Sequence, residues 1–318
     1  MKRATERQSS DDAAQCARLA ERVMLRSLLF ALLAVGMTAG CSHDWDKLSP
    51  AEGGDASPGG AGAGGSGGSG GASGSGGAAG QAGDSGTGGT ASCTDPSMIA
   101  VPGSTGGFYC VDRTEVTNTA YEGFLAGTPD LTGQPAECAW NTDLTPSGGW
   151  PPAVGTGDRP VSFVDFCDAT VFCATAGKRL CGAVGGGALG FGSFADAAAS
   201  EWYNACSENG KRAYPYGQTY DGTACNGTDY GVTGPVKTGS APKCEGGFSG
   251  LLDLSGNVFE WENSCADTAG ATDKCRIRGG GYNSNSANLK CDVAADAERS
   301  TATVTIGFRC CADAVISN

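Results

Sequence analysis

The sequence predicts a mixed α+β fold with much irregular structure, held together by disulfide bonds. Helical periodicity is scarce, turn-forming residues recur about every ten positions, and 14 of the 16 cysteines lie between Cys93 and Cys311. An even number of cysteines in an exported chain is typical of a disulfide framework. We therefore expect one folded domain over residues 93–318, rich in disulfides.

Charge and histidine content exclude several classes of protein. The chain carries 34 acidic and 21 basic residues, a net charge of −13. This charge excludes a nucleic-acid partner, because a duplex requires a basic footprint. The one histidine, His43, precedes the folded region. Histidine-ligated zinc sites, HExxH proteases and Ser-His-Asp hydrolases all require an imidazole, so they are excluded as well.

Residues 1–40 are predicted to be a signal peptide. The apolar run over residues 28–37 is shorter than the roughly 20 residues that span a bilayer, and it fits the central part of an export signal. The run ends in Thr-Ala-Gly-Cys, which resembles a bacterial lipobox, so Cys41 is the expected site of lipid attachment. An ordinary secreted protein cleaved near Ala39 is the alternative. Translation starts at either Met1 or Met24.

Residues 41–92 are predicted to be a disordered tether. From residue 51 to residue 90 the chain holds 19 glycines and no aromatic residue, so no hydrophobic core can form there. A glycine-rich coil of this length reaches roughly 35 Å. We expect a lipid-anchored head at the bacterial cell envelope, on the outer membrane, in the periplasm or outside the cell. The lipid anchor is its only expected membrane contact.

Within the folded region, spacing predicts a few regular elements. Apolar residues recur at three- and four-residue intervals over residues 164–176, and Gly177 is a natural stop, so a helix is expected there. A second helix is expected around residues 195–205. Short strands are expected over residues 275–278 and 307–311. The remainder is expected to be short strands and loops.

A series of sequence blocks resembles the formylglycine-generating enzyme (sulfatase-modifying factor) family, whose domain is distantly similar to C-type lectins. The blocks follow the family order over essentially the whole head, which makes the resemblance specific. They are Asp112-Arg-Thr-Glu-Val-Thr-Asn118, Phe172-Cys-Ala-Thr-Ala-Gly-Lys-Arg-Leu180, Glu201-Trp-Tyr203, Tyr214-Pro-Tyr-Gly217, Gly250-Leu-Leu-Asp-Leu-Ser-Gly-Asn-Val-Phe-Glu-Trp261, Arg278-Gly-Gly280 and Gly307-Phe-Arg-Cys310.

Three features depart from the family pattern. Phe166 stands where the family usually has tryptophan. Cys181 and a glycine-rich insertion reaching about Ala195 follow the Lys-Arg-Leu block directly. The third departure concerns the segment that holds two redox cysteines and a copper ion in the enzymes. Here that segment, residues 281–290, reads Gly-Tyr-Asn-Ser-Asn-Ser-Ala-Asn-Leu-Lys and contains no thiol.

The missing thiols argue against the family reaction. Oxidising a substrate cysteine with dioxygen there requires thiolate-bound copper, because copper(I) prefers sulfur ligands. Ser284 and Ser286 lie in the degenerate segment, and a hydroxyl is a harder ligand that cannot form a disulfide. We therefore expect neither copper nor formylglycine generation. The related iron-dependent sulfoxide synthases take their ligands from histidine and are excluded too.

Resemblance to the family implies two long-range disulfides, Cys173–Cys310 and Cys206–Cys291. Short sequence separation favours four further pairs, and elimination leaves a seventh. These five are Cys93–Cys110, Cys265–Cys275, Cys225–Cys244, Cys138–Cys167 and Cys181–Cys311. The alternative is a reactive pair, either the adjacent Cys310 and Cys311 or Cys167 with Cys173.

The resemblance also implies a structural calcium ion. Its expected ligands are the side chains of Asp253 and Glu260 and the carbonyl groups of Gly256 and Val258, oxygen donors of the kind that calcium prefers. Asn226 is a candidate for a second calcium site. An Asp residue and a Gly-Asn pair also form turns without any metal, which is the alternative.

Three functional hypotheses remain. The first is a non-catalytic head that binds an unidentified peptide, protein or glycan at the envelope or outside the cell. The second is a divergent enzyme of the family using carboxylates such as Asp292, Asp296 and Glu298. The third is a purely structural or display role. The aromatic residues Trp140, Trp150 and Tyr282 are expected either to line a binding groove or to pack in the core and its rim.

Overall fold

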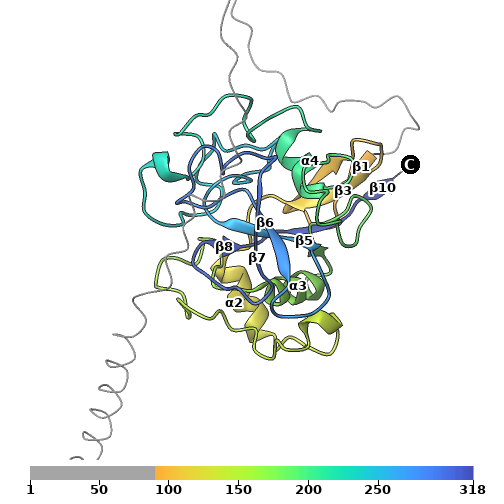
Figure 1. The fold of residues 1–318 in the computed structure, drawn as a ribbon, viewed down its shortest axis with the longest axis vertical. Coiled ribbons are helices and arrows are strands. Elements are labelled where there is room, and N and C mark those ends of the chain that lie inside the picture. The colour runs from red at the N-terminus through yellow and green to blue at the C-terminus, as the bar shows by residue number, and fades with distance from the viewer. Residues whose placement is uncertain (1–89, 318) are drawn as a thin grey trace, which may run out of the picture. The chain divides into compact units, whose positions relative to one another are not determined.

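The computed structural model describes residues 90–317 (Figure 1). The predicted signal peptide, the lipid site Cys41 and nearly all of the tether lie outside this range. Folded structure starts three residues earlier than expected, because Thr90–Ser92 forms strand β1. This strand pairs antiparallel with the last strand, β10 (Val315–Ser317). The first and last described segments of the head therefore lie side by side.

Two four-stranded sheets form the body of the domain. The first has the order β2-β3-β9-β4 and the second the order β7-β6-β5-β8. All pairings are antiparallel except that of β5 with β8. The strand bounds are β2 Met98–Pro102, β3 Phe108–Asp112, β4 Arg179–Leu180, β5 Phe259–Cys265, β6 Lys274–Arg278, β7 Ala294–Glu298, β8 Ile306–Gly307 and β9 Cys310–Asp313. Only Phe308 and Arg309 separate β8 from β9, so these two residues carry the chain from one sheet to the other.

Helices are short and flank the sheets. They are α2 Asn118–Ala126, α3 Phe166–Thr175 and α4 Glu201–Ser207, with 3-10 turns η2 Ala136–Cys138 and η3 Thr228–Tyr230. The helix expected over 164–176 is α3. The second expected helix starts later than predicted, because Ser200 caps it by accepting a hydrogen bond from the main-chain N–H of Tyr203. Helix α2 was not expected. Among the described residues, none of the helices has the length and apolar character needed to cross a bilayer.

The larger hydrophobic core packs α2 and α3 against the second sheet. Its aromatic centre is Tyr121, fully buried and stacked on Phe172 with ring centroids 5.5 Å apart. Phe308 meets Phe172 edge-on at 5.3 Å. Phe166, which replaces the usual tryptophan, packs edge-on against Trp261 at 6.0 Å. A smaller core lies between α4 and the first sheet and centres on Trp202.

Seven disulfides staple these layers together. The structure brings together all seven pairs expected from the sequence, including Cys173–Cys310 and Cys206–Cys291. The adjacent residues Cys310 and Cys311 do not form a pair with each other. They point to opposite faces of β9, so one bonds Cys173 in α3 and the other bonds Cys181 at the end of β4. Strand β9 is thereby fixed on both faces.

The start of α3 holds two buried acidic residues. Asp165 caps the helix by accepting from the N–H groups of Cys167 and Asp168, and Asp168 accepts from the N–H of Asp165 and from Asn141. Burial raises the pKa of Asp165 to about 6 and that of Asp168 to about 7. Folding therefore favours the neutral forms of this pair. Their contribution to stability is complete below the unfolded-state pKa of about 3.9 and is lost as pH rises through about 7.

We predict that this pair makes the free energy of unfolding depend on pH. Urea titrations of the unchanged chain and of Asp168→Asn should differ by an amount that falls by at least about 1 kcal/mol between about pH 4 and 8. Asp130→Asn is the control, because Thr132 donates hydrogen bonds that lower the pKa of this exposed carboxyl; its difference should stay flat over that range. A flat difference for Asp168→Asn would contradict the prediction.

Candidate functional site

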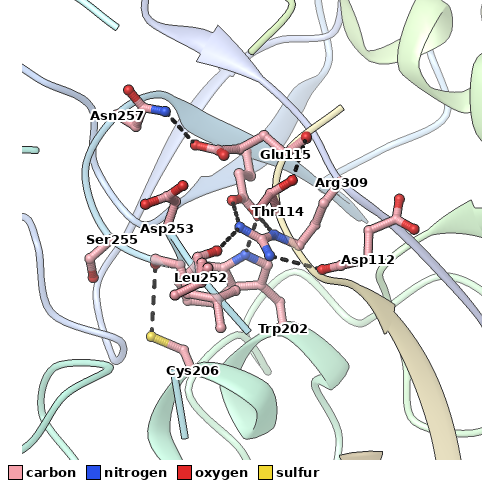
Figure 2. A network of polar contacts seen from close by, with 12 residues as sticks. Asp112, Thr114, Glu115, Trp202, Cys206, Leu252, Asp253, Ser255, Asn257 and Arg309 are labelled. Atoms are coloured by element: carbon pink, nitrogen blue, oxygen red, sulfur yellow. Dashed lines mark hydrogen bonds and ion pairs between the residues drawn. The ribbon is translucent and has the colours of Figure 1, made fainter. Parts of the chain in front are cut away.

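A buried arginine lies at the junction of the two sheets. All five N–H bonds of the Arg309 guanidinium are used: two reach the carboxylate of Glu260, at 2.6 and 2.7 Å, and three reach the carbonyl groups of Asp112, Arg113 and Leu252. Figure 2 shows Arg309 beside Asp112 and Leu252. The indole N–H of Trp202 donates to Glu260 Oε2 at 2.8 Å, the same oxygen that accepts from Arg309 Nε. Arg309 and Glu260 are each 1% exposed. This single side chain therefore joins β3, β5, β9 and the segment before residue 253.

Two more carboxylates are buried beside this pair. Glu115 and Asp253 are 2% and 4% exposed. Burial, reinforced by the nearby Asp253 charge, raises the pKa of Glu115 well above its usual range, and burial raises the pKa of Asp253 to about 6. Asn257 donates to Glu115 at 3.0 Å. Because neutral carboxyls are cheaper to bury than charged ones, burial favours the protonated forms of Glu115 and Asp253. Their protonation reduces the negative charge that Arg309 has to balance.

The turn over residues 253–258 has an unusual backbone. Asp253, Gly256 and Asn257 all have positive φ, at 59°, 75° and 61°. A Cβ at Gly256 would overlap the carbonyl of Asn226, so only glycine fits there. The turn also binds the neighbouring loop, because Gly256 donates to the carbonyl of Gly279 at 2.9 Å. The sequence block Asp-Leu-Ser-Gly-Asn-Val therefore forms a tight turn.

Two of the four predicted calcium ligands already have hydrogen-bond partners in the protein. Both carboxylate oxygens of Glu260 accept hydrogen bonds, which come from Arg309 and Trp202. One oxygen of Asp253 accepts from the N–H of Gly239. No cluster of three or more His, Cys, Asp or Glu side chains within residues 90–317 is placed to hold a metal. Calcium at Asp253, Gly256, Val258 and Glu260 stays a prediction from the resemblance.

Asn226, the candidate for a second calcium site, is tied to the same turn. It is 2% exposed, and its amide donates to the carbonyl of Gly234 and to Asn257 Oδ1, both at 3.1 Å. Its main-chain carbonyl accepts from the N–H of Asn257. Asn226 thus braces the turn, and its role as a calcium ligand also remains a prediction.

The segment that lacks thiols forms a closed loop. Ser284 is buried, its hydroxyl accepts from the N–H of Gly281 at 3.0 Å, and its carbonyl accepts from the N–H of Thr228. The carbonyl of Ser286 accepts from the hydroxyl of Tyr214 at 3.0 Å. The loop ends at Cys291, which is bonded to Cys206. Both serines are therefore held within a braced turn, and the Ser284 hydroxyl is engaged by the loop itself.

All the cysteine sulfur in the described part of the chain is cross-linked. Each of the 14 cysteines between residues 90 and 317 belongs to one of the seven disulfides. The alternative of a reactive pair at Cys310 and Cys311, or at Cys167 and Cys173, is contradicted by this pairing. No thiolate is therefore available among these residues to bind a soft metal.

The glycine-rich insertion after Cys181 covers strand β6. Phe191 lies over the guanidinium of Arg276, with 3.7 Å from its ring centroid to Cζ, and accepts a hydrogen bond from the same side chain through its carbonyl. The carbonyl of Phe194 accepts from Arg278, which is fully buried and also pairs with Glu262 at 2.9 Å. The insertion thus closes over a second buried ion pair.

A cavity of about 390 Å³ opens beside the loop. Its walls are the segments 212–224 and 242–246, and Tyr216 lines it. Tyr216 stacks on Tyr214, with ring centroids 5.6 Å apart, and Tyr214 in turn bonds Ser286. Nothing in the sequence indicates this cavity. The Tyr-Pro-Tyr-Gly block carries only the family resemblance, and the charged residues on the facing wall lie outside every block.

The remaining candidate residues lie elsewhere. Trp140 and Trp150 are partly buried and pack against the larger core, which confirms the packing interpretation for these two residues. Tyr282 is half-buried, and its N–H donates to the carbonyl of Asn257. The carboxylates Asp292, Asp296 and Glu298 are exposed, and the last two, on the edge strand β7, lie 3.9 Å from Lys274 of β6. The structure does not bring these acids into the cavity.

The family follows from the sequence together with this fold. A model of the sulfatase-modifying factor enzyme 1-like domain matches residues 88–314, well over half of the chain. The chain therefore belongs to this family, and the resemblance seen in the sequence is confirmed. A search of curated proteins finds no match.

Solved structures show similar folds at low identity. CarF is 21% identical with a TM-score of 0.46, covering 65% of this chain and 86% of its own. Treponema denticola variable protein 1 is 18% identical with a TM-score of 0.43, covering 64% and 84%. PvdO from Pseudomonas aeruginosa is 18% identical with a TM-score of 0.43, covering 68% and 90%.

We predict that the Arg309–Glu260 pair is a principal stabilising contact of the head. Arg309→Met should lower the free energy of unfolding by about 3–5 kcal/mol, because it leaves Glu260 buried and unpaired. The double variant Arg309→Met/Glu260→Gln should be more stable than Arg309→Met alone. Lys274→Met is the control and should cost less than about 1 kcal/mol, since its partners are exposed. Equal losses for Arg309→Met and Lys274→Met in denaturant titrations would refute the prediction.

Proposed function

We propose that this chain is a non-catalytic member of its family that binds a ligand at the cell envelope. The observation that carries this proposal is the state of its sulfur. All 14 cysteines of the described residues are in disulfides, and residues 279–290 contain none. Copper-dependent oxidation of a cysteine requires soft thiolate ligands, and serine and asparagine side chains do not supply them.

The loop itself supports the loss of catalysis. A hydroxyl that acts as a nucleophile has to be activated by an adjacent base, whereas the Ser284 hydroxyl accepts a hydrogen bond from the loop's own backbone. The turn over 253–258 holds the loop from behind through the Gly279 carbonyl. The segment is therefore built as a rigid support, as a binding surface requires.

Rigidity also favours binding over a purely structural role. The disulfides Cys206–Cys291 and Cys225–Cys244 fix the loop and the walls of the cavity, and a preformed site loses less entropy when a ligand binds. We further propose that Cys41 carries a lipid and that the glycine-rich segment tethers the head to the outer membrane. The ligand would then be a peptide, protein or glycan of the envelope or its surroundings.

The absence of catalysis can be tested directly. The mature chain, carrying Cys41→Ala, should produce no formylglycine from a cysteine-containing sulfatase peptide, with or without added copper, while a family member that keeps the cysteine pair serves as the positive control. Mass spectrometry of the peptide provides the measurement. Turnover above the copper-only background would overturn the proposal.

A thiol titration under denaturing conditions gives an independent check. We expect less than one free thiol per chain in this variant, because all 14 cysteines of the head are paired. Two or more reactive thiols would show that a redox pair exists, and would count against a non-catalytic head.

A further inference from the structure

The cavity beside the loop has rigid walls. One wall carries Tyr216 and Asp221, and the other carries Lys243 and Glu245. The disulfide Cys225–Cys244 joins the two walls directly behind these side chains. Its volume of about 390 Å³ falls within the range of small-molecule sites, roughly 300–1,000 Å³.

The arginine of the cavity is committed to the protein. Arg212 pairs with Glu208 at 2.6 Å and donates to the carbonyl of Pro215 at 3.0 Å. Its charge is therefore neutralised within the wall. It contributes shape and polarity to the cavity but does not offer a free cation.

Three other polar groups remain open to a ligand. Lys243 and the second carboxylate oxygen of Asp221 face each other across 3.8 Å, with side chains 65% and 45% exposed. The first oxygen of Asp221 accepts from Thr223, and Lys243 gives one of its three N–H bonds to the Thr223 hydroxyl at 3.1 Å, so one oxygen and two N–H bonds stay open. Glu245 uses only one oxygen, which accepts from Gly250 and Ser249. Exposed ion pairs at such distances are weak. A ligand can therefore replace the contact between these groups, or the water bound to them, at a small cost in free energy.

The balance of these groups selects a class of ligand. Two open carboxylates and one open ammonium disfavour a phosphate, sulfate or carboxylate, because a like charge would face it across the cavity. The polar lining equally disfavours a hydrocarbon. A hydroxyl group can donate to Asp221 or Glu245 and accept from Lys243. A neutral molecule with several hydroxyls therefore satisfies all three.

An aromatic ring completes the site. Tyr216 is held in place by Tyr214, on which it stacks, and by the main chain of Asp221, whose N–H donates to its hydroxyl at 3.1 Å. The negative face of an aromatic ring attracts the weakly positive C–H groups of a saccharide. We propose that this cavity binds a short neutral glycan, an inference that rests on the proposed binding function and names its ligand.

Calorimetric titration of the mature chain with neutral oligosaccharides of glucose, mannose, galactose and N-acetylglucosamine tests this inference. At least one should bind, and Lys243→Met and Asp221→Asn should each weaken it about tenfold or more, as expected for losing a hydrogen bond to a charged group. Lys237→Met and Asp158→Asn are matched controls. They alter an exposed ion pair outside the cavity, at 3.1 Å, and should leave the affinity unchanged.

Three results would overturn the inference. They are no binding of any neutral oligosaccharide at millimolar concentrations, binding that Lys243→Met leaves intact, and tighter binding of a sulfated oligosaccharide than of its neutral parent. Each of these leaves the proposal of a non-catalytic head standing. Formylglycine production would instead overturn that proposal without bearing on the cavity, so the two failures are distinguishable.

Discussion

The fold of this head depends on one buried guanidinium. Arg309 lies on the two-residue link between the sheets, and its hydrogen bonds reach Glu260 in β5, the end of β3 and the carbonyl of Leu252. Because a buried charge without partners is very costly, these segments have to meet around it. Trp202 connects α4 to the same carboxylate. The turn over residues 253–258 and the loop over residues 281–290 are then held in place by backbone hydrogen bonds.

The sequence predicted those elements whose causes are local. Helix α3 was found because its apolar spacing and its glycine stop lie within one short stretch of sequence. Helix α4 was placed too early, because the alanines of residues 195–199 suit a helix but belong to the turns that follow the insertion. Helix α2 was missed, since Gly123 interrupts its pattern and only packing of Tyr121 against Phe172 selects it. The contact of Tyr121 with Phe172 lies outside any local window, whereas the start of α4 is set by a local cap, Ser200.

The candidate site shows the same limit more sharply. The thiol-free loop could be identified from composition alone, because a missing cysteine is visible in any sequence. The partner of Glu260 could not, since Arg309 lies 49 positions further along the chain. The cavity was hidden for a similar reason, because Tyr216 and Lys243 line it from two separate segments, which the Cys225–Cys244 bridge joins.

The pairing of β1 with β10 has a mechanical consequence. A pull on the chain before Thr90 first loads this two-stranded ribbon, and from Ser92 the next residue along is Cys93. Its covalent bond to Cys110 passes the load into β3, an inner strand of a four-stranded sheet. Tension applied at this end of the domain is thus taken up by β1, β10 and β3 before it reaches the loop, the cavity and the helices.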